Sequence, residues 1–360
     1  MSWLLAFAGF ALLVILHELG HFAVAKWVGM RVEKFSLFFP PTLASKKVGE
    51  TEYAIGLIPA GGYVKITGMS PAEDLPDEVR TRAYHAQPVW KRMAVIVAGP
   101  AVNLILAFVL LFAYFGLIGA ETGTDRIGTI EKGYPAATAL EPGDRLIAVD
   151  GVRGDPVEMS KQIARHRCAQ APPTDGCRAA APATLVLGRD GRRVVERLTP
   201  VYDPQVERTR LGFTYAAGPR ETLPLGEAFT TTADRFWFIT KQTLSLPARI
   251  FDAEQRREIS GIVGSYEVTR QTIISDLAQV VGILAIISLS LAIVNLFPFL
   301  PLDGGHIFWA AVEKLRGGKP VPFSVMERAG VVGFMLVIGL FAIGLSNDIG
   351  RLSGEGFQVP

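Results

Sequence analysis

Cysteine is scarce in this chain, which has only two, Cys168 and Cys177, among its 360 residues. So few thiols exclude a framework of several disulfides, and their arrangement does not match a zinc site built from two cysteine pairs. Because the two cysteines lie close together in one segment, their spacing is typical of a local disulfide. We therefore predict a disulfide between Cys168 and Cys177.

A strong charge of either sign is also missing. The net charge of +2 is too small to indicate a nucleic-acid partner, and we expect none. The apolar stretch at the N-terminus lacks the basic flank and the small-residue cleavage site of a signal peptide, so we expect it to be retained. Hydrophobic residues make up 49% of the chain, which favours a protein that spans a lipid bilayer.

Four segments are apolar enough to cross a bilayer as helices, which takes about 20 residues. They are approximately Trp3–Val28, Met93–Ile118, Leu277–Phe297 and Ala329–Leu345, the last being the shortest. Lys and Arg are concentrated between the first two segments, and short loops rich in these residues stay in the cytoplasm. We therefore expect the N-terminus and the long region 119–275 to be extracytoplasmic.

The cytoplasmic loop is expected to be β-rich. Thr51–Ile58 and Gly61–Ile66 are strand-like runs, and the Pro and Gly residues between them are typical of a turn. A hairpin beside the first helix can lend an edge strand to an extended peptide. Candidate substrate-binding residues in this hairpin are Gly61, Gly62 and Tyr63.

The run His17-Glu18-Leu19-Gly20-His21 lies inside the first apolar segment. On a helix, His17 and His21 are one turn apart on the same face, where two imidazoles can hold one metal ion. Glu18 is then placed to act as a general base. Ionisable groups inside a membrane segment are costly and mark functional sites. The motif therefore predicts a catalytic zinc site.

A catalytic zinc site needs a third protein ligand, which must come from elsewhere in the chain. Pro298 and Pro301 must break the third apolar segment, and irregular backbone at membrane depth is tolerated only where it lines a protein cavity. Asp303 follows this break, and two glycines after it are expected to present it flexibly. Counting residues along the two helices places Asp303 and His17 toward the same, cytoplasmic, side. Asp303 is therefore the candidate third ligand.

Region 119–217 has the pattern of an α+β domain. A strand at Ile127–Ile130, a short helix, the turn at Pro142-Gly143-Asp144 and a strand ending at Asp150-Gly151 follow in an order that resembles a PDZ domain of bacterial proteases. Leu211-Gly212-Phe213 resembles the loop that binds a peptide carboxylate. Peptide C-termini are therefore expected ligands, and a β-rich spacer that binds nothing is the other interpretation.

Region 218–276 connects this domain to the third span. Its aromatic residues have loosely helical spacing, and two interpretations stay open. One is a helix that lies on the membrane surface, and the other is an ordinary packed helix.

These motifs together resemble the site-2 protease family of intramembrane zinc metalloproteases, in particular its RseP-like bacterial branch with a single PDZ domain. The resemblance rests on the His17–His21 motif, on the Asn-x-x-Pro-x-x-x-x-Asp-Gly pattern from Asn295 to Gly304, and on Gly99-Pro100-x-x-Asn103. It extends over about residues 10 to 345. Ile262 stands where the family usually has proline.

The resemblance implies a multi-pass α-helical membrane protein with about four spans, an inserted extracytoplasmic PDZ-like α+β domain and a cytoplasmic β-hairpin loop. The expected regions are 1–118 with the first two spans, 119–217 with the PDZ domain, 218–276 as an amphipathic connection, and 277–360 with the last two spans.

The resemblance also implies a chemistry. Zinc would be bound by His17, His21 and Asp303, Glu18 would be the general base, and Asn295 would hold the substrate backbone or the oxyanion. The protein would lie in a bacterial inner membrane. Its substrates would be single-span membrane proteins of the anti-sigma factor type and remnant signal peptides.

Two other functions fit parts of the pattern. A membrane-anchored PDZ binding module with a structural or inactive metal site would not need the carboxylate of Glu18. A soluble-type zinc protease on a membrane anchor would carry its motif outside the spans and would not need Asp303.

Overall fold

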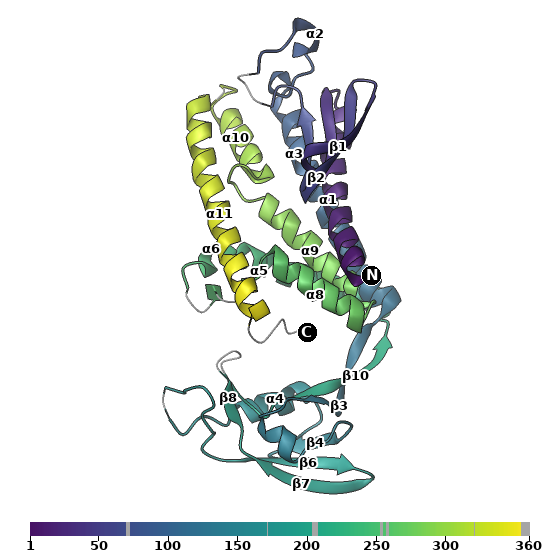
Figure 1. Cartoon of the computed structure of the whole chain (residues 1–360), viewed down its shortest axis with the longest axis vertical. Helices are drawn as coiled ribbons and strands as arrows, with labels where there is room; N and C mark the ends of the chain where they lie inside the picture. The colour runs from purple at the N-terminus through teal and green to yellow at the C-terminus, as the bar shows by residue number, and fades with distance from the viewer. Residues whose placement is uncertain are drawn as a thin grey trace. The chain divides into compact units, whose positions relative to one another are not determined.

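The computed structural model describes residues 1–69, 73–170, 172–203, 208–252, 255–256, 259–319 and 321–353. The chain divides into two compact units (Figure 1). Unit 1 comprises Met1–Ile118 and Thr222–Pro360, and unit 2 comprises Gly119–Glu221. Unit 2 is therefore an insertion between two helical parts of unit 1.

Unit 1 is built mainly of helices (Figure 1). The longer ones are α1 (Ser2–Trp27), α3 (Val89–Ala113), α5 (Leu225–Leu244), α8 (Ile262–Ser275), α9 (Gln279–Asn295), α10 (Asp303–Leu315) and α11 (Phe323–Ser353). The short ones are α2 (Asp77–Arg80), η1 (Tyr84–Ala86), η2 (Tyr114–Ile118) and α6 (Leu246–Arg249).

Three stretches of helix in the described residues are long and apolar enough to cross a membrane: Ser2–Trp27, Val89–Ile118 and Ser324–Leu352. The shorter apolar helix α9 corresponds to the third predicted span and has 17 residues. The prediction that the last span is the shortest is wrong, because α11 has 31 residues. Helix α11 continues through polar residues at both ends that the apolar segment left out, whereas α9 ends before Pro298 and Pro301.

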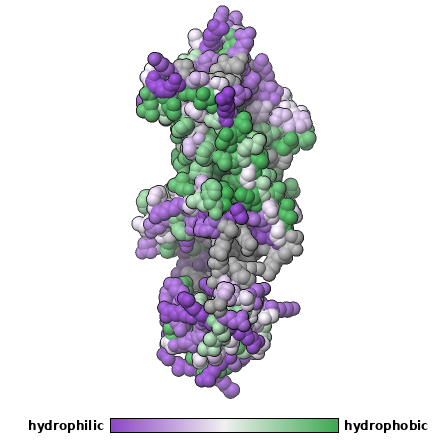
Figure 2. Space-filling view, turned by 90° about the vertical axis from the view of Figure 1, so that its left-hand side faces the viewer, coloured by the Kyte–Doolittle hydropathy of each residue, from purple (hydrophilic) through white to green (hydrophobic). Residues whose placement is uncertain are grey.

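Apolar side chains cover much of the surface of unit 1. Figure 2 shows them gathered in a broad area over this unit on the face drawn there. Examples with more than half of their surface exposed are Leu4, Ile105, Val109, Val332 and Met335. Apolar surface of this extent on long helices is suited to lipid rather than water. The chain is therefore a membrane protein.

The loop after α1 forms an antiparallel pair of long strands, β1 (Val32–Val48) and β2 (Thr51–Ile66). Both strands bend, so that Lys34 pairs with Lys65 on one side and with Glu52 on the other. Tyr53 in turn pairs with Lys46 as well as with Phe35. The two strands therefore provide four side-by-side segments, in the order 62–66, 32–37, 51–55 and 42–48.

This arrangement corrects the predicted hairpin. Runs 51–58 and 61–66 are extended as expected, but they belong to one strand and do not pair with each other. No strand is predicted above for Val32–Val48, and prolines such as those at 40 and 41 are unfavourable inside a strand. Those prolines fall at the bend of β1, where Phe38 has a φ of 71°, so they do not interrupt the pairing of the straight segments.

The turn between β1 and β2 is tied to α1 by charge. Glu50 accepts hydrogen bonds from Arg82 at 2.7 and 2.8 Å and from Lys26 at 2.8 Å. The hydrogen bonds from Arg82, which have the largest effect, and the one from Lys26 lower the pKa of Glu50 to about 2. The carboxylate is therefore charged at neutral pH, and the sheet is held at the end of α1.

Unit 2 contains a mixed arrangement of short strands and one helix. Its strands are β3 (Ala120–Ile130), β4 (Arg145–Val149), β5 (Val152–Arg153), β6 (Ala183–Arg189), β7 (Arg192–Leu198), β8 (Val201–Asp203), β9 (Arg208–Arg210) and β10 (Phe213–Glu221). The main sheet has the order β10-β3-β4-β6-β7, with β5 beside β4. Helix α4 (Pro156–Ala164) and the turn η3 (Pro135–Thr138) complete the unit.

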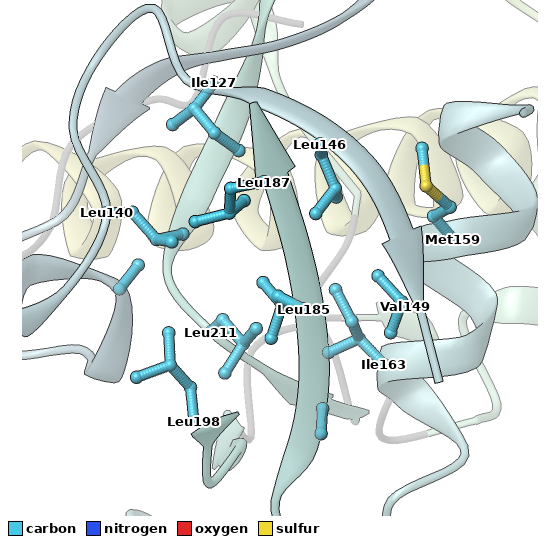
Figure 3. Close-up of a cluster of buried hydrophobic side chains, with 12 residues drawn as sticks. Ile127, Leu140, Leu146, Val149, Met159, Ile163, Leu185, Leu187, Leu198 and Leu211 are labelled. Atoms are coloured by element: carbon cyan, nitrogen blue, oxygen red, sulfur yellow. The ribbon is translucent and has the colours of Figure 1, made fainter. Parts of the chain in front are cut away.

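The core of unit 2 lies between this sheet and α4. Figure 3 shows Leu146 and Val149 of β4 near Met159 and Ile163 of α4. The α+β composition of this unit is as predicted. Its last strand continues to Glu221, which pairs with Ala120, so the predicted boundary at 217 falls inside β10. The PDZ assignment itself stays a prediction.

The predicted Pro-Gly-Asp turn is fixed by a buried carboxylate. Asp144 accepts a hydrogen bond from the backbone N–H of Glu141 at 2.9 Å and is paired with Arg189 at 2.6 Å. The Arg189 guanidinium lowers the pKa of Asp144, so the pair is charged at neutral pH. This pairing joins the turn before β4 to the end of β6.

The structure joins the sulfur atoms of Cys168 and Cys177, whose Cα atoms are 5.9 Å apart. Closing a loop of about ten residues restricts the unfolded chain and is worth about 2–3 kcal/mol. We predict that a Cys168→Ser/Cys177→Ser protein melts at lower temperature than the wild type but still cleaves substrate. Thermal unfolding and thiol titration of protein purified without reductant test this. Two free thiols in the untreated wild type would contradict the disulfide.

Candidate metal centre

Helix α1 presents both histidines of the motif to its neighbour α3. His17 and His21 are buried, and they lie one helical turn apart on the side where α1 contacts α3. Glycines allow the two helices to approach closely. A Cβ atom at Gly20 would lie 2.6 Å from the carbonyl oxygen of Ala98, and one at Gly99 would lie 2.2 Å from His21 Nε2. Neither position therefore tolerates a side chain.

The Nδ1 atoms of both rings face groups on α3. His21 Nδ1 lies 2.8 Å from the carbonyl oxygen of Val95, to which it donates its proton. His17 Nδ1 lies 3.4 Å from the side-chain amide of Asn103. With Nδ1 occupied in this way, the Nε2 atoms of the two rings are the ones that face each other, at 3.3 Å.

Asp303 reaches the same place from α10. Helix α9 ends at Asn295, the chain turns through the two prolines, and α10 begins at Asp303 itself. The following glycines do not act as flexible presenters, which corrects that expectation. A Cβ atom at Gly304 would lie 2.2 Å from the carbonyl oxygen of Leu296, and one at Gly305 would lie 2.5 Å from the backbone nitrogen of Leu300. They allow the first turn of α10 to pack directly on the preceding backbone.

The three side chains fit a zinc ion. Asp303 Oδ2 lies 3.3 Å from both His17 Nε2 and His21 Nε2, so the three atoms form a triangle with equal sides. Zinc bonds of about 2.0–2.1 Å in tetrahedral geometry require ligand atoms about 3.3–3.4 Å apart. Asp303 Oδ2 is also buried and has no hydrogen bond from the part of the chain that the structure describes, which is costly unless a cation satisfies it. These residues are therefore suited to hold the metal.

The triangle opens into a cavity of about 450 Å³. Glu18 lines this cavity, and among the described residues its carboxylate forms no hydrogen bond or ion pair. The other predicted site residues also line it, namely Asn295, Gly61, Gly62 and Tyr63. A Cβ atom at Gly62 would lie 3.0 Å from Glu18 Cγ, so segment 62–66 passes directly beside the candidate base.

Some residues of the site were not anticipated from the sequence. The carbonyl of Val95 leaves no signal, since any residue supplies one. His306 lines the cavity and forms no hydrogen bond within the described part of the chain. Gly99 and Asn103 belong to a pattern that the sequence singled out, although it did not reveal that they touch the two histidines.

The chain is similar to known proteins over nearly its whole length. The sequence profile of peptidase family M50 matches residues 5–340. The chain belongs to peptidase family M50, the site-2 protease family. A relative from Brucella suis biovar 1 (strain 1330) is 31% identical over 93% of this chain and 92% of its own. Relatives from Agrobacterium fabrum (strain C58) and Nostoc sp. (strain PCC 7120) are each 29% identical, over 96% and 94% of this chain and 94% and 93% of their own.

The names of these three relatives assign them, provisionally, to the zinc metalloproteases. As an M50 peptidase, the chain is a zinc metalloprotease that hydrolyses peptide bonds. The His17–His21 motif and the Asp303 segment both fall inside the matched range.

Substitution of Gly99 tests the packing against His21 without changing any candidate ligand. We predict that Gly99→Ala weakens zinc binding at least about tenfold, because the new methyl group occupies the position of the His21 ring. Zinc content after dialysis against a chelator measures this. Gly339→Ala is the matched control, since a Cβ atom at this glycine of α11 meets no atom within 4 Å. Equal zinc retention by both variants would show that the contact does not matter.

Proposed function

We propose that this M50 peptidase cleaves the membrane segments of single-span proteins within the bilayer, with zinc held by His17, His21 and Asp303. The observation that carries the proposal is the triangle of ligand atoms beside an unpaired carboxylate, Glu18, on a helix long and apolar enough to cross a membrane. A site for cleaving soluble peptides would not need to be built into such a helix.

When bound, zinc polarises a carbonyl group and makes water more acidic. Glu18 is placed on the cavity wall to accept the proton of the attacking water and then to return it to the leaving amine. Asn295 is the candidate donor to the substrate, because its amide lines the cavity and is bonded to no group among the described residues. Its N–H groups can hold the scissile carbonyl or the charge that develops on its oxygen.

A helical substrate must be extended locally before its carbonyls are accessible. Segment 62–66 is an edge segment of the sheet formed by β1 and β2. Residues from Gly61 to Val64 line the cavity. An edge strand can pair with an extended peptide through main-chain hydrogen bonds. We infer that the substrate adds to this edge beside Glu18, with Gly61, Gly62 and Tyr63 in contact with it.

The charge pattern supports a cellular location and an orientation for this protein. The basic residues between α1 and α3 favour a cytoplasmic location for this sheet in a bacterial inner membrane, with the N-terminus and unit 2 outside. Unit 2 is proposed to be a PDZ domain that admits substrates already shortened by another protease. Strand β10 follows Leu211-Gly212 and is at one end of the strand order, where a peptide C-terminus can add. Anti-sigma factors and remnant signal peptides are suitable substrate classes.

The alternative is a membrane-anchored peptide-binding module with an inactive metal site. An inactive site would have no reason to keep an unpaired carboxylate beside the metal triangle, since burying such a group is costly. The geometry around Glu18 therefore favours the protease.

We predict that Glu18→Gln lowers cleavage about 10²–10⁴-fold, because an amide cannot accept the proton. Zinc content and thermal stability should stay as in the wild type. The measurement is cleavage of a tagged single-span substrate co-expressed with either protein. Glu227→Gln, which removes an exposed carboxylate from α5, should cleave normally. Full turnover by the Glu18 variant would mean that another group activates the water.

Deletion of unit 2 tests whether this unit acts as a filter. Glu221 pairs with Ala120, so the ends of the insertion are neighbours and residues 121–220 can be replaced by a short Gly-Ser linker. Every proposed ligand lies in unit 1, and the shortened protein should still bind zinc and cleave shortened substrates. If unit 2 is a filter, this protein should also cut full-length substrates that the intact one leaves uncut. A folded deletion protein that cuts neither substrate would rule out filtering.

A further inference from the structure

The two histidines of the metal centre are oriented by different kinds of partner on α3. His21 donates from Nδ1 to a backbone carbonyl, that of Val95, at 2.8 Å. His17 Nδ1 instead faces a side chain, the amide of Asn103, at 3.4 Å. A carbonyl can only accept, so it fixes the proton of His21 on Nδ1. An amide can either donate or accept, so its orientation decides where His17 carries its proton.

Asn103 is closely confined. It is fully buried, and its backbone carbonyl accepts a hydrogen bond of 2.9 Å from Ser288 Oγ on α9. Its side-chain oxygen, Oδ1, is buried and has no hydrogen-bond partner among the described residues. A buried amide oxygen without a partner costs free energy, and the nitrogen of the same amide lies 3.4 Å from His17 Nδ1.

With the amide nitrogen facing His17, Nδ1 must accept, and the ring proton sits on Nε2. Nε2 is the atom that lies 3.3 Å from Asp303 Oδ2, and a proton there blocks the lone pair that a metal needs. Turning the amide by half a rotation about its terminal bond exchanges its nitrogen and oxygen, which are similar in size. Oδ1 then accepts the proton of Nδ1, and Nε2 keeps its lone pair.

We infer that Asn103 is a positioning residue of the metal centre, whose side-chain oxygen accepts the Nδ1 proton of His17 and so holds Nε2 ready to bind zinc. This inference rests on the proposed zinc ligands. Within the described part of the chain, one hydrogen bond would then give a partner both to Oδ1 of Asn103 and to the Nδ1 proton of His17. Hydrogen bonds of this kind behind a ligand typically change metal affinity about 10–100-fold.

The test compares zinc affinity among variants of the full-length protein in detergent, by competition with a chelator. Asn103→Leu keeps the approximate size of the side chain but cannot accept a proton, and it should bind zinc about 10–100 times more weakly. Asn103→Asp keeps an oxygen acceptor and should bind zinc within a few-fold of the wild type. Ser288→Ala removes the neighbouring hydrogen bond to the Asn103 backbone, and it should leave zinc affinity unchanged.

Wild-type zinc affinity in Asn103→Leu would overturn the inference. So would an Asn103→Asp protein that is folded and binds zinc as weakly as Asn103→Leu, since packing rather than the acceptor would then matter. If the leucine variant does not fold, Asn103→Ala replaces it in the same comparison. His17→Ala and Asp303→Ala separate the two proposals. If they keep wild-type zinc affinity, the proposed ligands are wrong, and if they lose zinc while Asn103→Leu does not, only the role of Asn103 fails.

Discussion

The close contact of α1 with α3 is the constraint on which the metal centre depends. Between apolar helices in a membrane there is little hydrophobic driving force, so packing relies on small residues that let backbones approach. Gly20 and Gly99 supply that approach here, each facing an atom on the other helix that a Cβ would overlap. A separation larger by the thickness of a methyl group would move the Val95 carbonyl out of reach of His21. The orientation of the ligand rings is thus set by backbone distance.

Helix α3 also helps to position Asp303, the proposed third ligand. Arg92 lies near the start of α3 and Glu313 near the end of α10. They form a bidentate ion pair, in which the Arg92 guanidinium donates hydrogen bonds of 3.0 and 2.5 Å to the two carboxylate oxygens of Glu313. Both side chains are largely buried, so breaking the pair would leave an uncompensated charge. Since Asp303 is the first residue of α10, this pair holds one end of the helix whose other end carries the ligand. One helix therefore aligns both halves of the candidate site.

The sequence was informative where a residue type has one reason to be present. Two histidines and a glutamate in an apolar helix, or an aspartate after two prolines, have few uses other than a metal site, and the structure brings His17, His21 and Asp303 together. It was less informative where structure depends on distant pairing. Runs 51–58 and 61–66 were predicted to form a hairpin, whereas both pair with Val32–Val48, whose two prolines fall at the bend around Phe38. The glycines after Asp303 were expected to provide flexibility. The nearby Leu296 carbonyl shows instead that they allow close packing.

The hydrogen bonding of the polar side chains distinguishes residues that maintain the geometry of the site from candidates for the reaction itself. In an apolar surrounding, a polar side chain without a partner is costly, so most such groups are paired. The ligand rings follow this rule, since their Nδ1 atoms face α3 and their Nε2 atoms face Asp303. Glu18, Asn295 and His306 do not, because all three line the cavity without a hydrogen bond among the described residues. Among the described residues, the unpartnered oxygens of Asp303 and Asn103 are suited to a metal ion and a ring proton, whereas the unbonded side chains of Glu18, Asn295 and His306 are free to meet water and a peptide. We therefore propose that the scissile bond lies in this cavity between Glu18 and Asn295, with His306 lining the same cavity.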